Sequence, residues 1–209
     1  NASMAGLLGP GFDPAPLFGA APVRAPGAIA INGAVTTGEL VAAATNAISI
    51  QGAVSAARAL RIDTAGVAGF GGASVAPLIA VQSGDLQLGA GSSLGDATTT
   101  ALTLVADDAA TAIAIGGAGS AGYSIDVAEM ARLRAQTITI SPRTSPAPVT
   151  IGSFTLQGSG TQANLFGAYG SLSISSVCPI RVVGAAHIEN AAPFTTLRLV
   201  AGGRVEVPV

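Results

Sequence analysis

The sequence predicts an all-β fold, a right-handed parallel β-solenoid of about eight coils with one short helical corner. Three observations predict it. Apolar residues alternate with small or polar residues in short runs that end in Gly, Asp or Asn, the pattern of strands with one buried face. From Ile79 onward these runs recur every 23 to 25 residues, which indicates stacked repeats. The 28 glycines and 49% hydrophobic residues suit narrow coils with small and aliphatic interiors.

The composition also argues against several classes of protein. A hydrophobic fraction of 49% is too high for a disordered chain, and a net charge of −2 without a basic cluster does not suit nucleic-acid binding. No uninterrupted apolar run approaches the roughly 18 to 20 residues of a membrane span. A single cysteine, Cys178, cannot form an internal disulfide, so cysteine usage does not identify a compartment.

The N-terminal segment differs from the rest of the chain. Residues 1–3 look like the remnant of an expression tag and are left out of the fold prediction. Residues 4–26 contain five prolines, a density that disfavours regular helix and central strand. We expect residues 4–26 to form a linker or a loosely docked cover, and residues 27–209 to form the solenoid.

Two strands are expected in each period. The alternating pairs that begin the periods start at Ile29, Ile48, Ile79, Leu102, Ile125, Val149, Leu172 and Leu197. A second pair follows most of them, at Leu60 and Ile62, Leu86 and Leu88, Ile113 and Ile115, Ile138 and Ile140, Phe154 and Leu156, Ile180 and Val182, and Val205 and Val207. Because equivalent residues stack in a solenoid, two inward rows are predicted: Ile79, Leu102, Ile125, Val149, Leu172 and Leu197, and beside it Val81, Leu104, Val127, Ile151, Ile174 and Leu199.

Three segments interrupt the strand pattern. Residues 65–77 are rich in glycine and are expected to lengthen the second coil, while residues 141–148 contain three prolines and are expected to form an irregular corner. Residues 127–135 read VAEMARLRA, and their helix-forming residues predict a short helical turn between Ile125 and Ile138.

The sequence pattern of the predicted coils resembles that of large secreted β-helical exoproteins typified by filamentous haemagglutinin. The resemblance lies in ATNAISIQGAVSAARALRID at residues 44–63, YSIDVAEMARLRAQTITI at 123–140 and TTLRLVAGGRVEV at 195–207, and it covers residues 27–209. It implies export by two-partner secretion through an outer-membrane transporter, and an extracellular or cell-surface adhesin-like role. The Asn-rich motifs of that family's N-terminal secretion domain are not found, so the resemblance implies a shaft segment.

Acidic residues and the single histidine are the first candidates for chemistry. Asp107 and Asp108 are adjacent at a strand end, and Asp85 and Asp96 are expected on neighbouring corners. Polysaccharide-active enzymes on solenoid scaffolds use clustered carboxylates or carboxylates with Arg. The coils contribute too few acids to the inferred faces for such a cluster, so the sequence favours Asp residues that form turns and cap their own backbone. His187 lies near Glu189 and Asn190, without the further partners that a triad or a metal site needs, and is expected at a corner.

Other candidates favour structural roles. The run GGAGSAGYSID at 116–126 lacks the Asp of a calcium-binding β-roll, and its glycines are expected to permit a tight corner with positive φ. Cys178 and the separated aromatic residues are expected to pack at corners, and Thr98, Thr99 and Thr100 are consecutive, which argues against a period-spaced ice-binding ladder. The aromatic residues considered are Tyr123, Tyr169, Phe166 and Phe194.

The arginines are dispersed along the chain and are expected on solvated faces, with an anionic-glycan strip as the alternative. Arg181 and Arg198 are predicted on adjacent coils, where Glu189 or Glu206 could pair with them. The arginines considered are Arg58, Arg61, Arg132, Arg134, Arg143, Arg181, Arg198 and Arg204.

These observations together predict a non-enzymatic repeat protein, a shaft or adhesin segment of a large secreted exoprotein. No catalytic residue, metal site or cofactor is predicted, and the expected partners are host or surface glycans or proteins. Two alternatives stay open: a polysaccharide lyase or hydrolase that uses Asp107 and Asp108, and a subunit of a self-assembling surface layer or filament.

Overall fold

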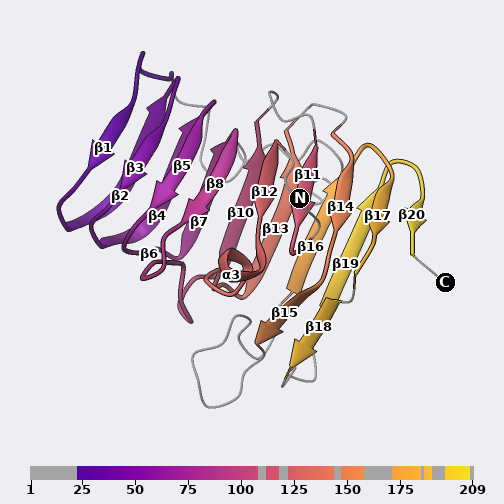
Figure 1. Ribbon diagram of the computed structural model, residues 1–209. Helices are drawn as coiled ribbons and strands as arrows, with labels where there is room; N and C mark the ends of the chain where they lie inside the picture. The colour runs from indigo at the N-terminus through magenta and orange to yellow at the C-terminus, as the bar shows by residue number, and fades with distance from the viewer. Residues whose placement is uncertain are drawn as a thin grey trace, which may run out of the picture.

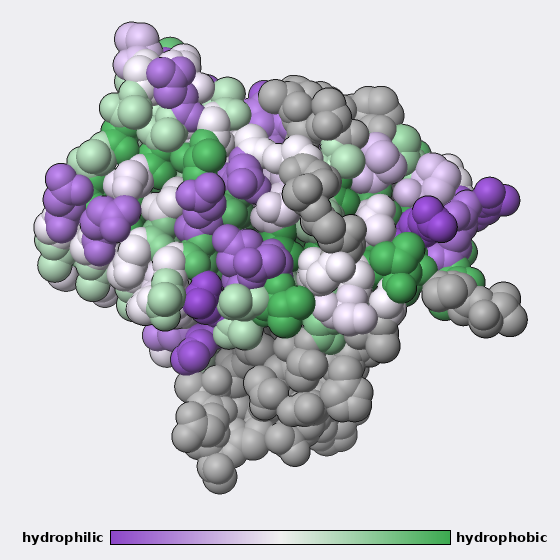
Figure 2. Space-filling view, in the orientation of Figure 1, coloured by the Kyte–Doolittle hydropathy of each residue, from purple (hydrophilic) through white to green (hydrophobic). Residues whose placement is uncertain are grey.

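The computed structural model describes residues 23–107, 112–117, 122–143, 147–157, 171–184, 186–189 and 196–207. In these residues the chain is all-β apart from one short helix, and every strand pairing is parallel. Figure 1 shows the strands side by side, from β1 at one end to β20 at the other. Parallel neighbours are what the recurrence of alternating strands every 23 to 25 residues predicts. The outer face seen in the same orientation mixes hydrophilic and hydrophobic residues (Figure 2).

The largest sheet has the strand order β19-β16-β13-β10-β7-β4-β6-β9, and β2 pairs with the other edge of β4. Its members are β2 (Val35–Ala44), β4 (Val54–Thr64), β6 (Ala73–Val75), β7 (Leu78–Ser83), β9 (Ser93–Leu94), β10 (Ala101–Ala106), β13 (Thr137–Pro142), β16 (Ser171–Ser176) and β19 (Thr196–Ala201). The long strand β4 pairs with β6 through its first residues and with β7 through its last ones, so it contributes to two faces.

Three smaller sheets complete the fold. The first has the order β1-β3-β5-β8, with β1 (Ile29–Ile31), β3 (Ile48–Ile50), β5 (Val67–Phe70) and β8 (Asp85–Leu88). The second has the order β12-β11-β14-β17-β20, with β11 (Ile113–Ile115), β12 (Tyr123–Ile125), β14 (Val149–Ile151), β17 (Ile180–Val182) and β20 (Val205–Glu206). The third pairs β15 (Phe154–Gln157) with β18 (Ala186–Glu189).

The core consists of aliphatic rows that cross the strands. The registers of the largest sheet stack one row of Leu60, Ile79, Leu102, Ile138, Leu172 and Leu197, and a second of Ile62, Val81, Leu104, Ile140, Ile174 and Leu199. From β4 to β16 each of these residues is at most 1% exposed. Burial of aliphatic side chains contributes about 25 cal/mol per Å² of apolar surface, so these rows are the main source of stability.

The predicted rows were therefore wrong in their middle members. Ile125, Val149 and Ile151 lie in the sheet of β11, β12 and β14. Val127 is the first residue of the helix. Ile138 takes the place in the row after Leu102. The reason is that the chain forms β11, β12 and the helix between β10 and β13, and β12 stands before β11 in the sheet although it follows it in sequence. A constant 23-residue spacing cannot represent this reversal.

Two interruptions also differ from expectation. Residues 65–77 do not form a long insertion, because they contain the strands β5 and β6. Ser141 and Pro142, predicted in an irregular corner, are the last residues of β13, and residues 144–146 lie outside the described part. Strand pairing begins at Ala25, which bridges Ala44, two residues before the predicted boundary at residue 27.

The predicted helical corner is confirmed as α3 (Val127–Met130). Asp126 is its N-cap: its side chain accepts the backbone N–H of Glu129 at 2.7 Å, while the Glu129 carboxylate accepts the Asp126 N–H at 2.9 Å. This reciprocal capping box satisfies donors that a helix start leaves open. Met130 and Leu133 are fully buried, so the turn is anchored in the core.

A junction of side chains joins two of the sheets next to α3. The strand β8 ends the first small sheet, and β12 lies beside it. Glu129 accepts the Leu88 N–H at 3.0 Å, Arg132 donates to the Leu88 carbonyl at 2.7 Å, and Asp85 accepts the Ser124 N–H at 3.0 Å. Side chains therefore replace a regular backbone ladder between β8 and β12.

Candidate functional site

Asp107 lies on the outward side of the largest sheet, where polar residues of neighbouring strands converge. It follows β10, and its N–H donates to the Ser83 carbonyl at 2.8 Å. Asp63 of β4 is in register with Gln82 of β7. Both side chains point outward, because outward positions alternate with core positions along each strand. Asp63, Gln82 and Asp107 are all buried although they point away from the aliphatic core.

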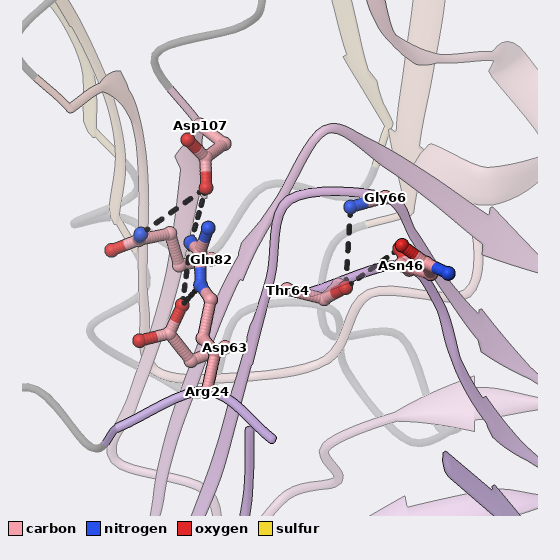
Figure 3. Close-up of polar contacts among 7 residues, drawn as sticks. All are labelled: Arg24, Asn46, Asp63, Thr64, Gly66, Gln82 and Asp107. Carbon is pink, nitrogen blue, oxygen red and sulfur yellow. Dashed lines mark hydrogen bonds and ion pairs between the residues drawn. The ribbon is translucent and has the colours of Figure 1, made fainter. Parts of the chain in front are cut away.

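Arg24 reaches these residues from the segment before β1, and Figure 3 shows its guanidinium between the two carboxylates. Its Nε donates to Asp63 Oδ1 at 2.8 Å, and its Nη2 pairs with the same oxygen at 2.7 Å. Nη2 also forms an ion pair with Asp107 Oδ2, to which Gln82 Nε2 donates at 3.4 Å. We call Arg24, Asp63, Gln82 and Asp107 the Arg24 cluster.

The electrostatics of the Arg24 cluster favour a structural role, in which Arg24 holds Asp63 and Asp107 together as a clamp, over an acid-base role. Partial burial by itself lowers the pKa of Arg24, but hydrogen bonds to Asp107 and Asp63 outweigh it and raise that pKa above its ordinary value. The guanidinium therefore stays charged and holds both carboxylates. A general base must be able to reach a substrate proton, whereas these two carboxylates already accept hydrogen bonds from the protein. The arrangement suits cross-linking of the chain before β1 to β4 and to the end of β10.

A second polar contact in Figure 3 fixes a corner between strands. Thr64 Oγ1 donates to the Asn46 carbonyl at 2.9 Å and accepts the Gly66 N–H at 3.2 Å. Gly66 is required here, because a Cβ on it would lie 1.4 Å from the Asn46 carbonyl oxygen. The corner after β4 thus stacks directly on the corner after β2.

The other acidic candidates do not join the Arg24 cluster. Asp96 accepts the Thr98 N–H at 2.8 Å, which confirms the predicted turn-forming role. Asp85 was predicted on a corner but is the first residue of β8, where it belongs to the junction with β12. Asp108 lies outside the described residues.

His187 was predicted at a corner, and this was wrong. It lies in the strand β18, in register with Thr155 of β15, and Glu189 is the last residue of the same strand. Asn190 lies outside the described residues. Within the part of the chain that the structure describes, no group of three or more His, Cys, Asp or Glu residues could hold a metal ion.

One arginine is placed differently from the prediction. Arg61 of β4 is only 4% exposed and does not lie on a solvated face. Arg181 and Arg198 lie on β17 and β19, which belong to different sheets and contact each other. Arg181 stands in register with Glu206, whose carboxylate accepts from Arg204 Nε at 2.7 Å in an exposed ion pair.

Three further predictions have mixed outcomes. Gly116 has a φ of +67°, which confirms the expected glycine corner. Cys178 is half-buried just after β16, and its N–H donates to Ser176 Oγ at 3.0 Å. Tyr123 was expected at a corner but is a fully buried strand residue in β12. Tyr169, Phe166 and Phe194 lie outside the described residues.

Sequence reasoning missed Arg24 and Glu129. Arg24 stands in the proline-rich segment, 39 residues from Asp63 and 83 from Asp107, so no local pattern connects these residues. Glu129 could have been found, because Asp126 and Glu129 have the spacing of a capping box. Burial raises the pKa of Glu129 above its ordinary value, and the N–H donors of Asp126 and Leu88 lower it only in part.

Comparisons with known proteins give no family for this chain. No family model, curated protein or solved structure matches it. Among the described residues, no helix is both long and apolar enough to cross a membrane. Functional conclusions therefore depend on the geometry of the sheets and of their side chains.

Proposed function

We propose that residues 27–209 form a right-handed parallel β-solenoid of about eight coils, and that it serves as a non-enzymatic shaft or adhesin segment of a large secreted, cell-surface exoprotein. The observation that carries the proposal is the pair of aliphatic rows that cross six parallel strands from β4 to β19 in one register. At about 4.8 Å per strand, these rows extend about 24 Å along the stack.

The contacts of the described residues favour a load-bearing role. Parallel strands in a continuous ladder share force among many backbone hydrogen bonds, and the core beneath them is close to fully buried from β4 to β16. The Arg24 cluster adds a cross-link between the chain before β1, β4 and the end of β10. Its charged groups are used within the protein, which supports a structural role over an acid-base role.

A replacement experiment in the parent exoprotein tests the spacer role. Residues 27–209 are exchanged either for an unrelated parallel β-solenoid of similar length or for a Gly/Ser linker of the same contour length. A rigid spacer predicts that the unrelated solenoid restores cell-surface presentation and adhesion by the distal part, whereas the flexible linker does not. Full function with the linker, or failure of the unrelated solenoid, would overturn the proposal.

The location is tested separately. Antibody against residues 27–209 is used on culture medium, intact cells and cell lysate from the source bacterium. Secretion predicts signal in the medium or on intact cells, and dependence on an outer-membrane transporter. Signal confined to the lysate contradicts it.

A further inference from the structure

A shallow groove lies on the outward side of the sheet formed by β3, β5 and β8. It encloses about 380 Å³ and is lined by Gln51, Gln87, Glu129, Leu88 and the backbone of residues 69–71 and 89. Gln51 and Gln87 are exposed, whereas Glu129 of α3 is only 9% exposed and is held at the groove by its contact with Leu88. We call this feature the glutamine groove. It is separate from the Arg24 cluster, because the two share no residue.

The glutamine groove exists because one outward side chain is missing. Ser49, Gly69 and Gln87 stand in register on β3, β5 and β8, at positions that alternate with buried core residues. Gly69 leaves a gap between the other two. Since neighbouring strands are about 4.8 Å apart, the backbones of β3 and β8 that flank this gap are about 10 Å apart.

The fold does not require glycine at position 69. Its φ is not in the left-handed region, and a Cβ would meet only the Ile48 carbonyl oxygen, at an ordinary 3.9 Å. Gly84, in contrast, would place a Cβ 2.2 Å from the Ala65 carbonyl oxygen. Glycine inside a strand is less stable than alanine and often marks a bulge, a bend, or close approach of another backbone or a ligand. The register is regular at Gly69 and no backbone atom of a neighbouring strand lies closer than 3.9 Å to the position of a Cβ, so approach of a ligand is the explanation that fits.

The polar groups at the glutamine groove suit a hydroxyl-rich neutral ligand. Each glutamine amide can donate and accept, and Gln51 uses one N–H on Ser49 Oγ at 2.7 Å, which fixes its orientation. The Glu129 carboxylate is held by two backbone N–H groups and retains further acceptor capacity. Because this carboxylate repels anions, an uncharged ligand is favoured over a sulfated or sialylated one.

A peptide strand is a poorer occupant. The floor strand β5 is paired on both sides, with β3 and β8, so its backbone cannot accept an added strand. Recognition must therefore come from side chains, and paired amide and carboxylate groups match the vicinal hydroxyls of a sugar. We propose that the glutamine groove, through Gln51, Gln87 and Glu129 around Gly69, binds an uncharged saccharide.

The test uses an array of neutral, sialylated and sulfated oligosaccharides with the purified chain. The expected result is retention of one or more neutral oligosaccharides and weaker retention of their anionic derivatives. Titration of the best neutral oligosaccharide then measures affinity. Absence of any binding, or binding to anionic oligosaccharides alone, overturns the proposal, and neither result bears on the spacer role.

Two variants locate the binding. Gly69→Val fills the gap with a residue that suits a strand, and Gln87→Ala removes one amide without filling it. Each variant is expected to raise the dissociation constant of the oligosaccharide about tenfold or more, which corresponds to the loss of one or two hydrogen bonds. Thermal melting checks that both variants stay folded.

Gly38→Val is the matched control. Gly38 is also a strand glycine, in β2, and a Cβ there would meet only Arg58 Nη2, at 3.8 Å. This variant is expected to keep the affinity of the unaltered chain. Equal affinity of Gly69→Val and the unaltered chain would place the binding elsewhere and overturn the proposal.

Discussion

The Arg24 cluster brings two ion pairs of the described residues together at one place. Two buried carboxylates share one guanidinium, because Arg24 forms an ion pair with Asp63 and another with Asp107. A buried pair of this kind contributes little relative to apolar residues, yet loss of one partner is expensive because it leaves a buried charge uncompensated. Arg24 is therefore expected to matter more than any exposed arginine.

Arg24→Ala is expected to lower the free energy of unfolding by about 1 to 3 kcal/mol, below the value for a fully buried pair because the Arg24 side chain keeps 21% exposure. Urea denaturation measures it. Arg204→Ala is the control, since the Arg204 and Glu206 pair is exposed and should contribute at most about 1 kcal/mol. Similar losses in the two variants would contradict the clamp. In the background of Asp63→Asn and Asp107→Asn, Arg24→Ala should cost less.

At Tyr123, removal of a polar group is expected not to lower the free energy of unfolding, in contrast to Arg24→Ala. The Tyr123 hydroxyl is fully buried and forms no regular hydrogen bond among the described residues; burial raises its pKa, and the nearby Ser83 side chain opposes this only in part. Tyr123→Phe is expected to leave the free energy of unfolding unchanged or to raise it by up to about 1 kcal/mol, because an unsatisfied buried polar group is removed. Denaturation of both proteins checks this, with Tyr123→Ala, at a loss of about 3 to 5 kcal/mol, as the packing control. A clear loss in Tyr123→Phe would show that the hydroxyl is paired.

At the scale of elements, α3 matters more for what it joins than for its own length. A four-residue helix is not stable alone. It places the side chains of Glu129 and Arg132 next to the N–H and the carbonyl of Leu88, which form no regular backbone hydrogen bonds with β12. The two side chains thus satisfy these groups at the edge of β8. The junction therefore couples a local capping box to the contact between two sheets.

Glu129 makes this junction sensitive to pH. Its pKa in the folded protein is raised above the ordinary 4.5 by burial, with Asp126 and Asp85 adding to the effect. A carboxyl group with a raised pKa contributes stability that is fully present below pH 4.5 and is lost as the pH rises through the folded-state pKa. The stability of the unaltered chain relative to Glu129→Gln is therefore expected to fall from acidic to neutral pH.

Urea denaturation of both proteins between pH 4 and 8 measures that difference. Glutamine keeps only one acceptor oxygen, so one of the two backbone donors loses its partner and a pH-independent offset of about 1 kcal/mol is also expected. Arg132 and the acidic neighbours remain in both proteins and cancel in the comparison. A difference that stays constant across this pH range would show that Glu129 does not titrate differently on folding.

For the whole molecule, the alternating pattern was sufficient to predict strands with aliphatic inner faces, since this period of two is a local property, and the longer repeat predicted their parallel stacking. The pattern could not predict which strands stack. The reversal of β11 and β12 depends on long-range pairing, and it moves Ile125 out of the row to which its spacing had assigned it. The Arg24 cluster escaped prediction for the same reason, because its members are brought together only by the stacking of strands.

The position of a residue along the stack should determine what it contributes. Leu102 is fully buried in the middle of its row, whereas Leu197 on β19 is 38% exposed. Leu102→Ala is expected to cost about 2 to 5 kcal/mol, and Leu197→Ala distinctly less, because only the first leaves a cavity between two neighbouring strands. Thermal or urea unfolding of the two variants measures both losses. Equal losses would mean that β19 is covered as fully as β10.

The side-chain junction at β8 has a mechanical consequence. In the largest sheet, backbone hydrogen bonds connect all strands from β4 to β19 without interruption. On the opposite side, β8 and β12 are connected by side chains that bind Leu88 and Ser124. Bending that opens this side stretches those side-chain contacts and the two backbone hydrogen bonds between Leu94 and residues 132 and 134. Bending in the opposite direction must break a continuous ladder of backbone hydrogen bonds. The molecule is therefore expected to bend more easily in the direction that opens the side of β8 and β12, with the bend centred at α3.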